Sequence, residues 1–228
     1  MKESNKIITG IFLSEIKNRF LCLVLINGKE TACYIPSSCR LSNFINLNGK
    51  TVLLKPTKGK DTRTEYAVYA VKHGRGFMLL NLSEANKVVE RQLHRRCFAF
   101  LGKRKNISHE IKIEDYKADL FIHDTSTIIE IKSILTTDNN TIFPSVHSER
   151  AILQLFKIKD LLDKKYKVCY MLVSMNPYIN SIKLNETDKK FYDLFRKCID
   201  KGMICIGLTV KLNENSPTIY KKLNVVVD

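Results

Sequence analysis

The sequence lacks the cysteine pairs and the long apolar runs that define several classes of protein. Its seven cysteines are scattered and include no C-x-x-C pair, so we expect reduced, buried thiols and neither a zinc site nor a disulfide framework. No apolar run approaches the ~20 residues that span a bilayer. Residues 1–6 lead into no signal-peptide core, and no internal repeat is found. We therefore expect a soluble, cytoplasmic protein with no membrane partner.

Acidic residues are scarce compared with basic ones. The chain has 38 Lys and Arg against 23 Asp and Glu, a formal charge of +15. Such an excess favours a polyanionic partner, with nucleic acid ahead of an anionic membrane. The local peak is residues 87–105, where seven basic residues stand against Glu90 alone. A Lys-rich and Asn-rich chain can also follow from base composition, so charge alone leaves the partner open.

The first eighty residues read as an all-β unit. A chain of 228 residues with 44% hydrophobic content can fill a real core. Short alternating runs are separated by turn signals such as Asn27-Gly28. Five or six short strands predict an OB-like barrel over residues 1–82. Arg19 and Arg40, with Tyr34 nearby, could bind a nucleic-acid strand through charge and stacking, or could belong to an ordinary solvated surface.

The rest of the chain, residues 83–228, predicts a mixed α/β domain in which three strands follow the first helix. Its second helix, over residues 148–164, is expected to turn Phe156 toward the core. The pattern predicts helices from 83, over 148–164 and over 187–201, and strands over 107–113, 116–123, 127–134, 168–175, 203–210 and 219–227.

The first of these helices begins at a capping residue and has two unlike faces. The hydroxyl of Ser83 can cap it. An apolar stripe at helical spacing extends as far as Cys97. Lys87, Arg91 and Arg95 fall on the opposite side, and we predict that this basic face binds phosphates.

The most informative motif is Asp119 followed by Glu130-Ile131-Lys132. If the two strands form a hairpin through residues 123–126, side-chain alternation places Glu130 and Lys132 on one face and turns Ile131 into the core. Asp119 can then lie beside them. Two carboxylates and an ammonium at one sheet edge suit a hard divalent cation and an activated water. The same pattern also arises by chance on a solvated strand face.

The element order and the motif together resemble the PD-(D/E)xK nucleases, in which an αβββαβ core carries the acid on one strand and E-x-K on the next. The chain also resembles the sugar fermentation stimulation protein A (SfsA) family over most of its length. The matching segments are Lys117-Ala118-Asp119-Leu120-Phe121, Ile129-Glu130-Ile131-Lys132-Ser133, Phe143-Pro144 with Ser148-Glu149-Arg150, and, more weakly, Asn18-Arg19-Phe20-Leu21, Tyr34-Ile35-Pro36-Ser37-Ser38-Cys39 and Leu80-Asn81-Leu82 with Ala85-Asn86.

This resemblance implies an OB-like domain joined to a PD-(D/E)xK domain, and a protein that binds nucleic acid and cleaves DNA or RNA. The sequence departs from the family pattern at Ser145, where the family has Asp. Ser37-Ser38-Cys39 also lacks the Asn and Gly of the N-terminal motif, and Ala151-Ile152-Leu153-Gln154 replaces a Gly-x-Lys-His-like stretch. The metal-binding set is intact, so these departures concern substrate contacts or partner surfaces.

Roles for the motif residues follow from their chemistry. Asp119 and Glu130 are predicted to ligate Mg²⁺ or Mn²⁺ through carboxylate oxygens, with the backbone carbonyl of Ile131 as a third ligand. Lys132 is predicted to stabilise the attacking hydroxide or the charge that builds on the phosphate.

Two further polar residues and three arginines complete the predicted site. Glu110 could ligate a second ion or orient water, and Gln154 stands where related nucleases often place a polar residue that steadies the site. Both could instead be solvent-facing. Arg150 joins Arg19 and Arg40 as expected nucleic-acid contacts.

The predicted function is metal-dependent hydrolysis of nucleic-acid phosphodiester bonds. The alternatives are a non-catalytic nucleic-acid-binding protein, such as a transcriptional regulator, and an RNA-processing accessory or protein-interaction module. The sequence leaves the oligomeric state open.

Overall fold

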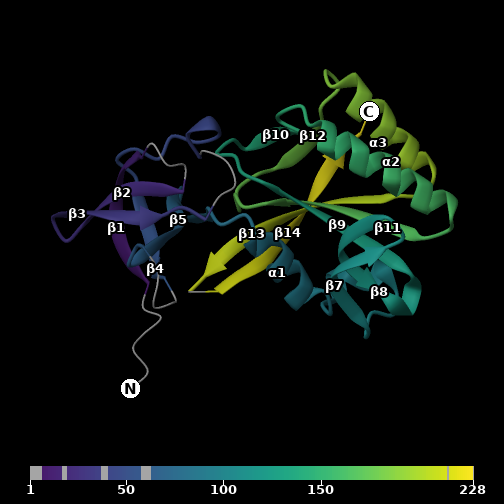
Figure 1. The fold of residues 1–228 in the computed structure, drawn as a ribbon, viewed down its shortest axis with the longest axis horizontal. Helices are drawn as coiled ribbons and strands as arrows, with labels where there is room; N and C mark the ends of the chain where they lie inside the picture. Colours follow the sequence, from purple (N-terminus) through teal and green to yellow (C-terminus); the bar gives the residue numbers. More distant parts are fainter. Residues whose placement is uncertain (1–6, 17–19, 37–40, 58–62, 215, 228) are drawn as a thin grey trace.

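The computed structural model describes residues 7–16, 20–36, 41–57, 63–214 and 216–227. Its N-terminal part is a five-stranded barrel with a sixth strand at one edge (Figure 1). The sheet order is β3-β2-β1-β4-β5-β6, and a parallel pairing of Tyr34 with Ala67 joins β3 to β5 and closes the barrel. The strands are β1 (Ile8–Glu15), β2 (Leu21–Ile26), β3 (Lys29–Tyr34), β4 (Thr51–Pro56), β5 (Tyr66–His73) and β6 (Gly76–Leu79).

Local sequence explains the barrel strands. In β2, Cys22, Val24 and Ile26 are buried while the residues between them are partly exposed, as period-two alternation requires. Asn27 and Gly28 connect β2 to β3 with φ values of 50° and 80°. Two successive left-handed residues form a two-residue hairpin turn that matches the twist of the strands. The predicted OB-like barrel is confirmed.

The C-terminal part is an eight-stranded mixed sheet with helices on both faces (Figure 1). The strand order is β10-β12-β14-β13-β11-β9-β8-β7. The helices are α1 (Glu84–Gln92), α2 (Glu149–Asp163) and α3 (Lys189–Asp200), and the strands are β7 (Ile107–Ile113), β8 (Tyr116–Ile122), β9 (Thr127–Ile134), β10 (Asn140–Phe143), β11 (Lys167–Ser174), β12 (Ser181–Leu184), β13 (Ile204–Asn213) and β14 (Ser216–Val226).

The two faces of this sheet pack against two different hydrophobic cores. The first fills the barrel and continues without a break through α1 to one face of the sheet, so that Val24, Val88 and Leu208 belong to the same cluster. The second core lies under α2 and α3 and includes Leu155 and Phe195. The barrel and the sheet are therefore joined by packed apolar side chains.

Several local predictions need correction. Strands β10 and β12 were not predicted. Ser83 does not cap α1 with its side chain, because its backbone is helical, with φ of −66° and ψ of −16°, and not extended as in a capping residue. Its hydroxyl donates to the side-chain oxygen of Asn81 at 2.8 Å. Phe156 is 45% exposed and does not turn inward. Cys97 lies beyond the end of α1 and is partly buried.

Within the described ranges, four cysteines are buried and two are partly buried, all with free thiols; Cys39 lies outside those ranges. No helix in the described part of the chain is long and apolar enough to cross a membrane.

Candidate active site

The candidate site lies where the β8–β9 ladder ends. These strands pair antiparallel at Leu120–Ile129 and at the two positions before the turn, and no pairing continues beyond Leu120. Asp119 and Glu130 are the next residues in that register. Instead of a backbone bond, the Asp119 carboxylate accepts a hydrogen bond from the Ile131 amide at 2.7 Å. A side chain thus stands where the ladder would otherwise continue.

Asp119 is held from two elements. One carboxylate oxygen accepts from the Ile131 amide on β9, and the other accepts from Nδ2 of Asn86 on α1 at 3.0 Å. Each carboxylate oxygen has a second lone pair, so these bonds orient Asp119 and still leave it able to bind a cation.

Glu130 is a buried acid with two side-chain partners. Its side chain is 3% exposed, and Nζ of Lys132 lies 2.6 Å from Oε1. The Tyr116 hydroxyl donates to Oε2. Burial raises the pKa of Glu130 above its usual value, the negative charge of Asp119 adds to the rise, and Lys132 opposes it. Burial also raises the pKa of Tyr116 far above its usual value, so its hydroxyl remains a donor.

Lys132 bridges strand and helix. Its ammonium lies 2.6 Å from Glu130 and donates to Oε1 of Gln154 on α2 at 2.7 Å. The contact confirms that Glu130 and Lys132 share a face, and Ile131 is buried in the first core as predicted. Ser148 begins α2 by accepting from the Ala151 amide at 3.2 Å, which fixes the start of the helix that carries Gln154.

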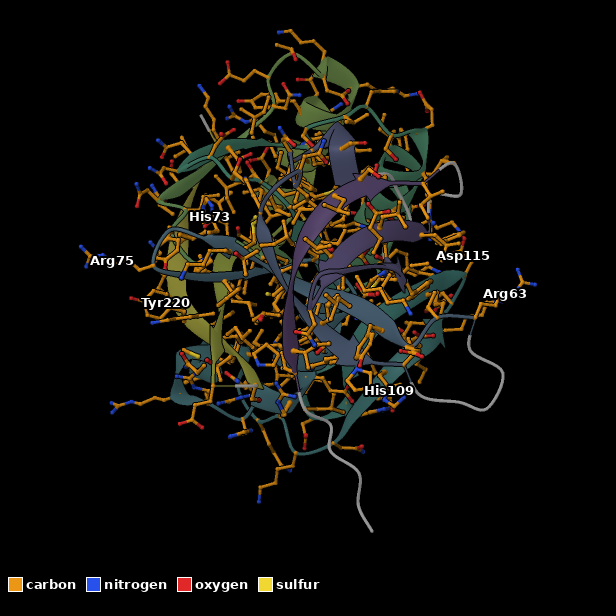
Figure 2. The ribbon with its side chains drawn as sticks, turned by 90° about the vertical axis from the view of Figure 1, so that its left-hand side faces the viewer. Arg63, His73, Arg75, His109, Asp115 and Tyr220 are labelled. Atoms are coloured by element: carbon orange, nitrogen blue, oxygen red, sulfur yellow. The ribbon has the colours of Figure 1, made fainter. Side chains whose placement is uncertain are left out.

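A cleft of about 450 Å³ opens over the two acids and Gln154. It is lined by Asp119, Glu130 and Gln154, and three cations stand around it, namely Lys117, Arg150 and Lys157. Asp115 also lines the cleft. In Figure 2 it lies on the opposite side of the molecule from Arg75 and Tyr220. The cleft is therefore a mixed-charge site at the β7–β8 end of the sheet.

Glu110 lines the same cleft but differs from the other acids. It lies on β7 between residues that pair with Leu120 and Ala118, and its φ is 49°. Its carboxylate is 68% exposed and lies 2.6 Å from the Lys117 ammonium. No group of three or more His, Cys, Asp or Glu among the described residues is placed to hold one ion. The prediction that Glu110 ligates a second ion or orients a water molecule stays a prediction.

The residues of the predicted basic face make hydrogen bonds and ion pairs within the protein. Arg91 donates to the Pro217 carbonyl at 2.7 Å and Arg95 donates to the Ile219 carbonyl at 2.9 Å, so Arg91 ties α1 to β14 and Arg95 ties the segment after α1 to the same strand. Lys87 forms an exposed ion pair with Glu84 at 3.2 Å. All three remain exposed, and their binding of phosphate stays a prediction. Arg19 and Arg40 lie outside the described residues.

Two site residues were not predicted. Asn86 was part of a matched segment but had no assigned role, since nothing in the sequence links it to a residue 33 positions away. Tyr116 begins a strand and reads as ordinary core. A signal for Tyr116 does exist, because a buried tyrosine hydroxyl needs a polar partner.

Two family models match the chain. The SfsA N-terminal OB domain matches residues 16–80, and the Sugar fermentation stimulation protein RE domain matches residues 83–216. The chain belongs to the SfsA family. This confirms the predicted family, and the order α1, β7, β8, β9, α2, β11 agrees with the αβββαβ core once β10 is counted as an insertion.

SfsA relatives match the chain over its whole length. Proteins named Sugar fermentation stimulation protein homolog from Pseudoalteromonas atlantica and Clostridium perfringens are 22% and 26% identical to it, with 100% of each chain covered. The structure of Pyrococcus furiosus SfsA in complex with Ca²⁺ matches with a TM-score of 0.81 at 18% identity, covering 98% of this chain and 97% of that chain. The match confirms the mixed α/β fold with its N-terminal barrel.

Proposed function

We propose that this protein is a metal-dependent nuclease that hydrolyses phosphodiester bonds of DNA or RNA. The observation that carries the proposal is the convergence of Asp119, Glu130 and Lys132 at the end of the β8–β9 ladder, where the two acids line a cleft. A protein that only binds nucleic acid gains nothing from a buried carboxylate facing a phosphate backbone, because that charge repels phosphate and its burial is costly.

The residues suit Mg²⁺ or Mn²⁺, since both ions prefer oxygen ligands. Asp119 and Glu130 would hold the ion, together with a main-chain oxygen such as the Ile131 carbonyl. Burial disfavours the charged form of Glu130 and so raises its pKa. A cation bound beside the carboxylate would stabilise this charged form, so burial favours binding of a cation here. The related Pyrococcus furiosus protein is described in complex with Ca²⁺, another oxygen-preferring cation. When bound there, such an ion would supply an activated water molecule and would offset negative charge on the phosphate.

The remaining roles belong to the side chains. Gln154 and Glu130 hold the Lys132 ammonium between them at 2.7 and 2.6 Å, so its charge is already oriented before substrate arrives. A fixed donor that faces the charge developing in the transition state needs no reorganisation during the reaction. Asn86 positions Asp119, and Tyr116 positions Glu130. Arg150, Lys117 and Lys157 would attract the phosphates flanking the cleaved bond.

The test is cleavage of labelled single- and double-stranded DNA and RNA with Mg²⁺, Mn²⁺ or EDTA. We expect Lys132→Met to lose ~10²–10³ in rate, the usual effect of removing one electrostatic transition-state contact. Nucleic-acid affinity should stay within a few-fold, because one of 38 basic residues contributes little to the total field. Lys197→Met, at an exposed position on α3, is the matched control and should cleave normally.

The second candidate is a non-catalytic nucleic-acid-binding protein, which the net charge of +15 favours. A wild type that binds all four substrates and cuts none with either metal would support this candidate. Equal cutting by Lys132→Met and wild type would mean that the activity arises elsewhere.

A further inference from the structure

A second cleft, of about 350 Å³, lies between the barrel region and the segment that joins β9 to β10. Its apolar wall comes from four parts of the chain: Phe44 after the 3₁₀ turn at Leu41–Asn43, Leu82 before α1, Ile134 at the end of β9, and Ile142 on β10. Ser133 at the end of β9 and the Asp138 carboxylate add polar groups. The volume falls within the range of pockets that hold small organic groups.

This cleft adjoins the predicted catalytic residues at two points. Ile134, which lines the cleft, lies two positions beyond Lys132 on the same face of β9, and Cα atoms two positions apart in a strand are separated by about 7 Å. Leu82 lies just before α1 and four positions before Asn86, which holds Asp119, so at most ~14 Å of chain separates the two Cα atoms. A strand whose phosphate lies at Asp119 and Glu130 would therefore bring a neighbouring nucleotide to this cleft.

The lining selects the part of the nucleotide that fits. No lysine, arginine or histidine is among the described residues that line it, so it is unsuited to phosphate. A flat, neutral base suits an apolar wall, and Phe44 offers an aromatic face on which a base can stack.

Asp138 adds a hydrogen-bonding preference. Its amide donates to the Thr136 hydroxyl at 3.1 Å, and its carbonyl accepts from Nδ2 of Asn176 at 3.1 Å. These bonds fix the loop, while the carboxylate of Asp138 has no hydrogen-bond or ion-pair partner among the described residues. A carboxylate accepts from the exocyclic amino group of a base such as cytosine and repels the carbonyl edge of thymine.

We propose that this cleft is a nucleobase subsite that takes one unstacked base with an exocyclic amino group, next to the bond that is cut. The proposal rests on the proposed function and names its substrate as single-stranded or locally unpaired nucleic acid. Asp138 reads the amino group, and Phe44 supplies the stacking surface.

The experiment measures binding of short fluorescent oligo-dC, oligo-dT and an abasic oligomer of equal length to the full chain in EDTA, where metal-dependent cleavage does not occur. Homopolymers present the same group in every register. We expect wild type to prefer oligo-dC to oligo-dT by roughly tenfold. Asp138→Asn should abolish or reverse that ratio, since the amide can donate to the thymine carbonyl. Phe44→Leu should weaken both base-containing oligomers roughly tenfold and leave the abasic oligomer unchanged.

Asp193→Asn, on the exposed side of α3, makes the same change of charge away from the cleft and should keep the wild-type ratio. Equal dC/dT ratios in wild type and Asp138→Asn would overturn the subsite, even if the protein cleaves. A base preference without cleavage would leave the subsite standing and remove the nuclease proposal. Failure of wild type to bind any of these oligomers would overturn the subsite, whereas the cleavage assay decides the nuclease proposal.

Discussion

Two acid–lysine pairs on the same sheet have the same separation and opposite properties. Glu130–Lys132 and Glu110–Lys117 both have 2.6 Å between nitrogen and oxygen. The first acid is 3% exposed and its pKa is raised, chiefly by burial. The second is 68% exposed and its pKa is lowered, chiefly by the hydrogen bond from Lys117. The nitrogen–oxygen distance is the same in both pairs, so the burial of the acid decides whether its pKa is raised or lowered.

The largest expected difference between the pairs is in stability. Lys132→Met leaves a buried carboxylate without its cation, and breaking a buried pair in this way typically costs roughly 3–5 kcal/mol. Lys117→Met removes the partner of an exposed acid and should leave the free energy of unfolding unchanged within error. Urea unfolding of both variants measures the contrast. Equal midpoints for the two variants would show that the Glu130 pair is as well solvated as the Glu110 pair.

The response to a divalent ion should separate the pairs next. Mg²⁺ or Mn²⁺ bound only by the folded state stabilises it by ~2.7 kcal/mol at a concentration of one hundred times Kd, which for a chain of this size raises Tm by roughly 5–10 °C. Asp119→Asn should abolish this rise, and Glu110→Gln should keep it. The measurement is a melting curve with and without the ion. A full rise in Asp119→Asn would place the ion at another site.

Acidification should affect the two acids in opposite directions. The pKa of Glu130 is raised in the folded state, so its contribution to stability is present below the ordinary value of 4.5 and is lost as pH rises through the folded pKa. The pKa of Glu110 is lowered, so its contribution is present above 4.5 and is lost as pH falls through its folded value. Relative to wild type, Glu130→Gln should gain stability as pH rises, and Glu110→Gln should lose it.

Chemical unfolding at several pH values in EDTA tests this expectation. If the stability of both variants relative to wild type changed in the same direction with pH, burial would not be what separates the two pKa values.

The smallest effect is expected from the exposed cations. Arg150→Ala and Lys87→Ala should each weaken nucleic-acid binding for all sequences and reduce the slope of log affinity against log salt by about 1 if each contacts one phosphate. Arg91 and Arg95 are poor choices for this test because they also hold β14. An unchanged slope in Arg150→Ala would move the phosphate path away from the cleft.

The sequence predicted the features that depend on local periodicity. Alternation in β9 placed Glu130 and Lys132 together, and the contact between them confirms it. Strands β10 and β12 were missed because each has only four residues, too few for a periodic signal. Phe156 follows Leu155 by one position, so periodicity alone could not decide which of the two the core would take. The structure buries Leu155 fully.

The parts of the site that sequence could not supply depend on distant elements. Asn86 meets Asp119 across the packing of α1 on the sheet, and the second cleft combines segments from the barrel, from the linker and from β10. Such contacts depend on tertiary packing, which the spacing of residues along the chain does not predict.

The shared core has a consequence for how the molecule loses its structure. One apolar cluster includes barrel residues and residues on the sheet. At the β5–β6 turn, Tyr178 packs so closely that a β-carbon would lie 3.0 Å from its ring at Gly74 and 3.0 Å from its hydroxyl oxygen at Gly76. Unfolding the barrel alone would expose the sheet face that it covers. Heat or denaturant should therefore melt the chain in one cooperative transition, and a chain cut between residues 82 and 83 should yield two fragments that aggregate when expressed separately and refold only when they are mixed.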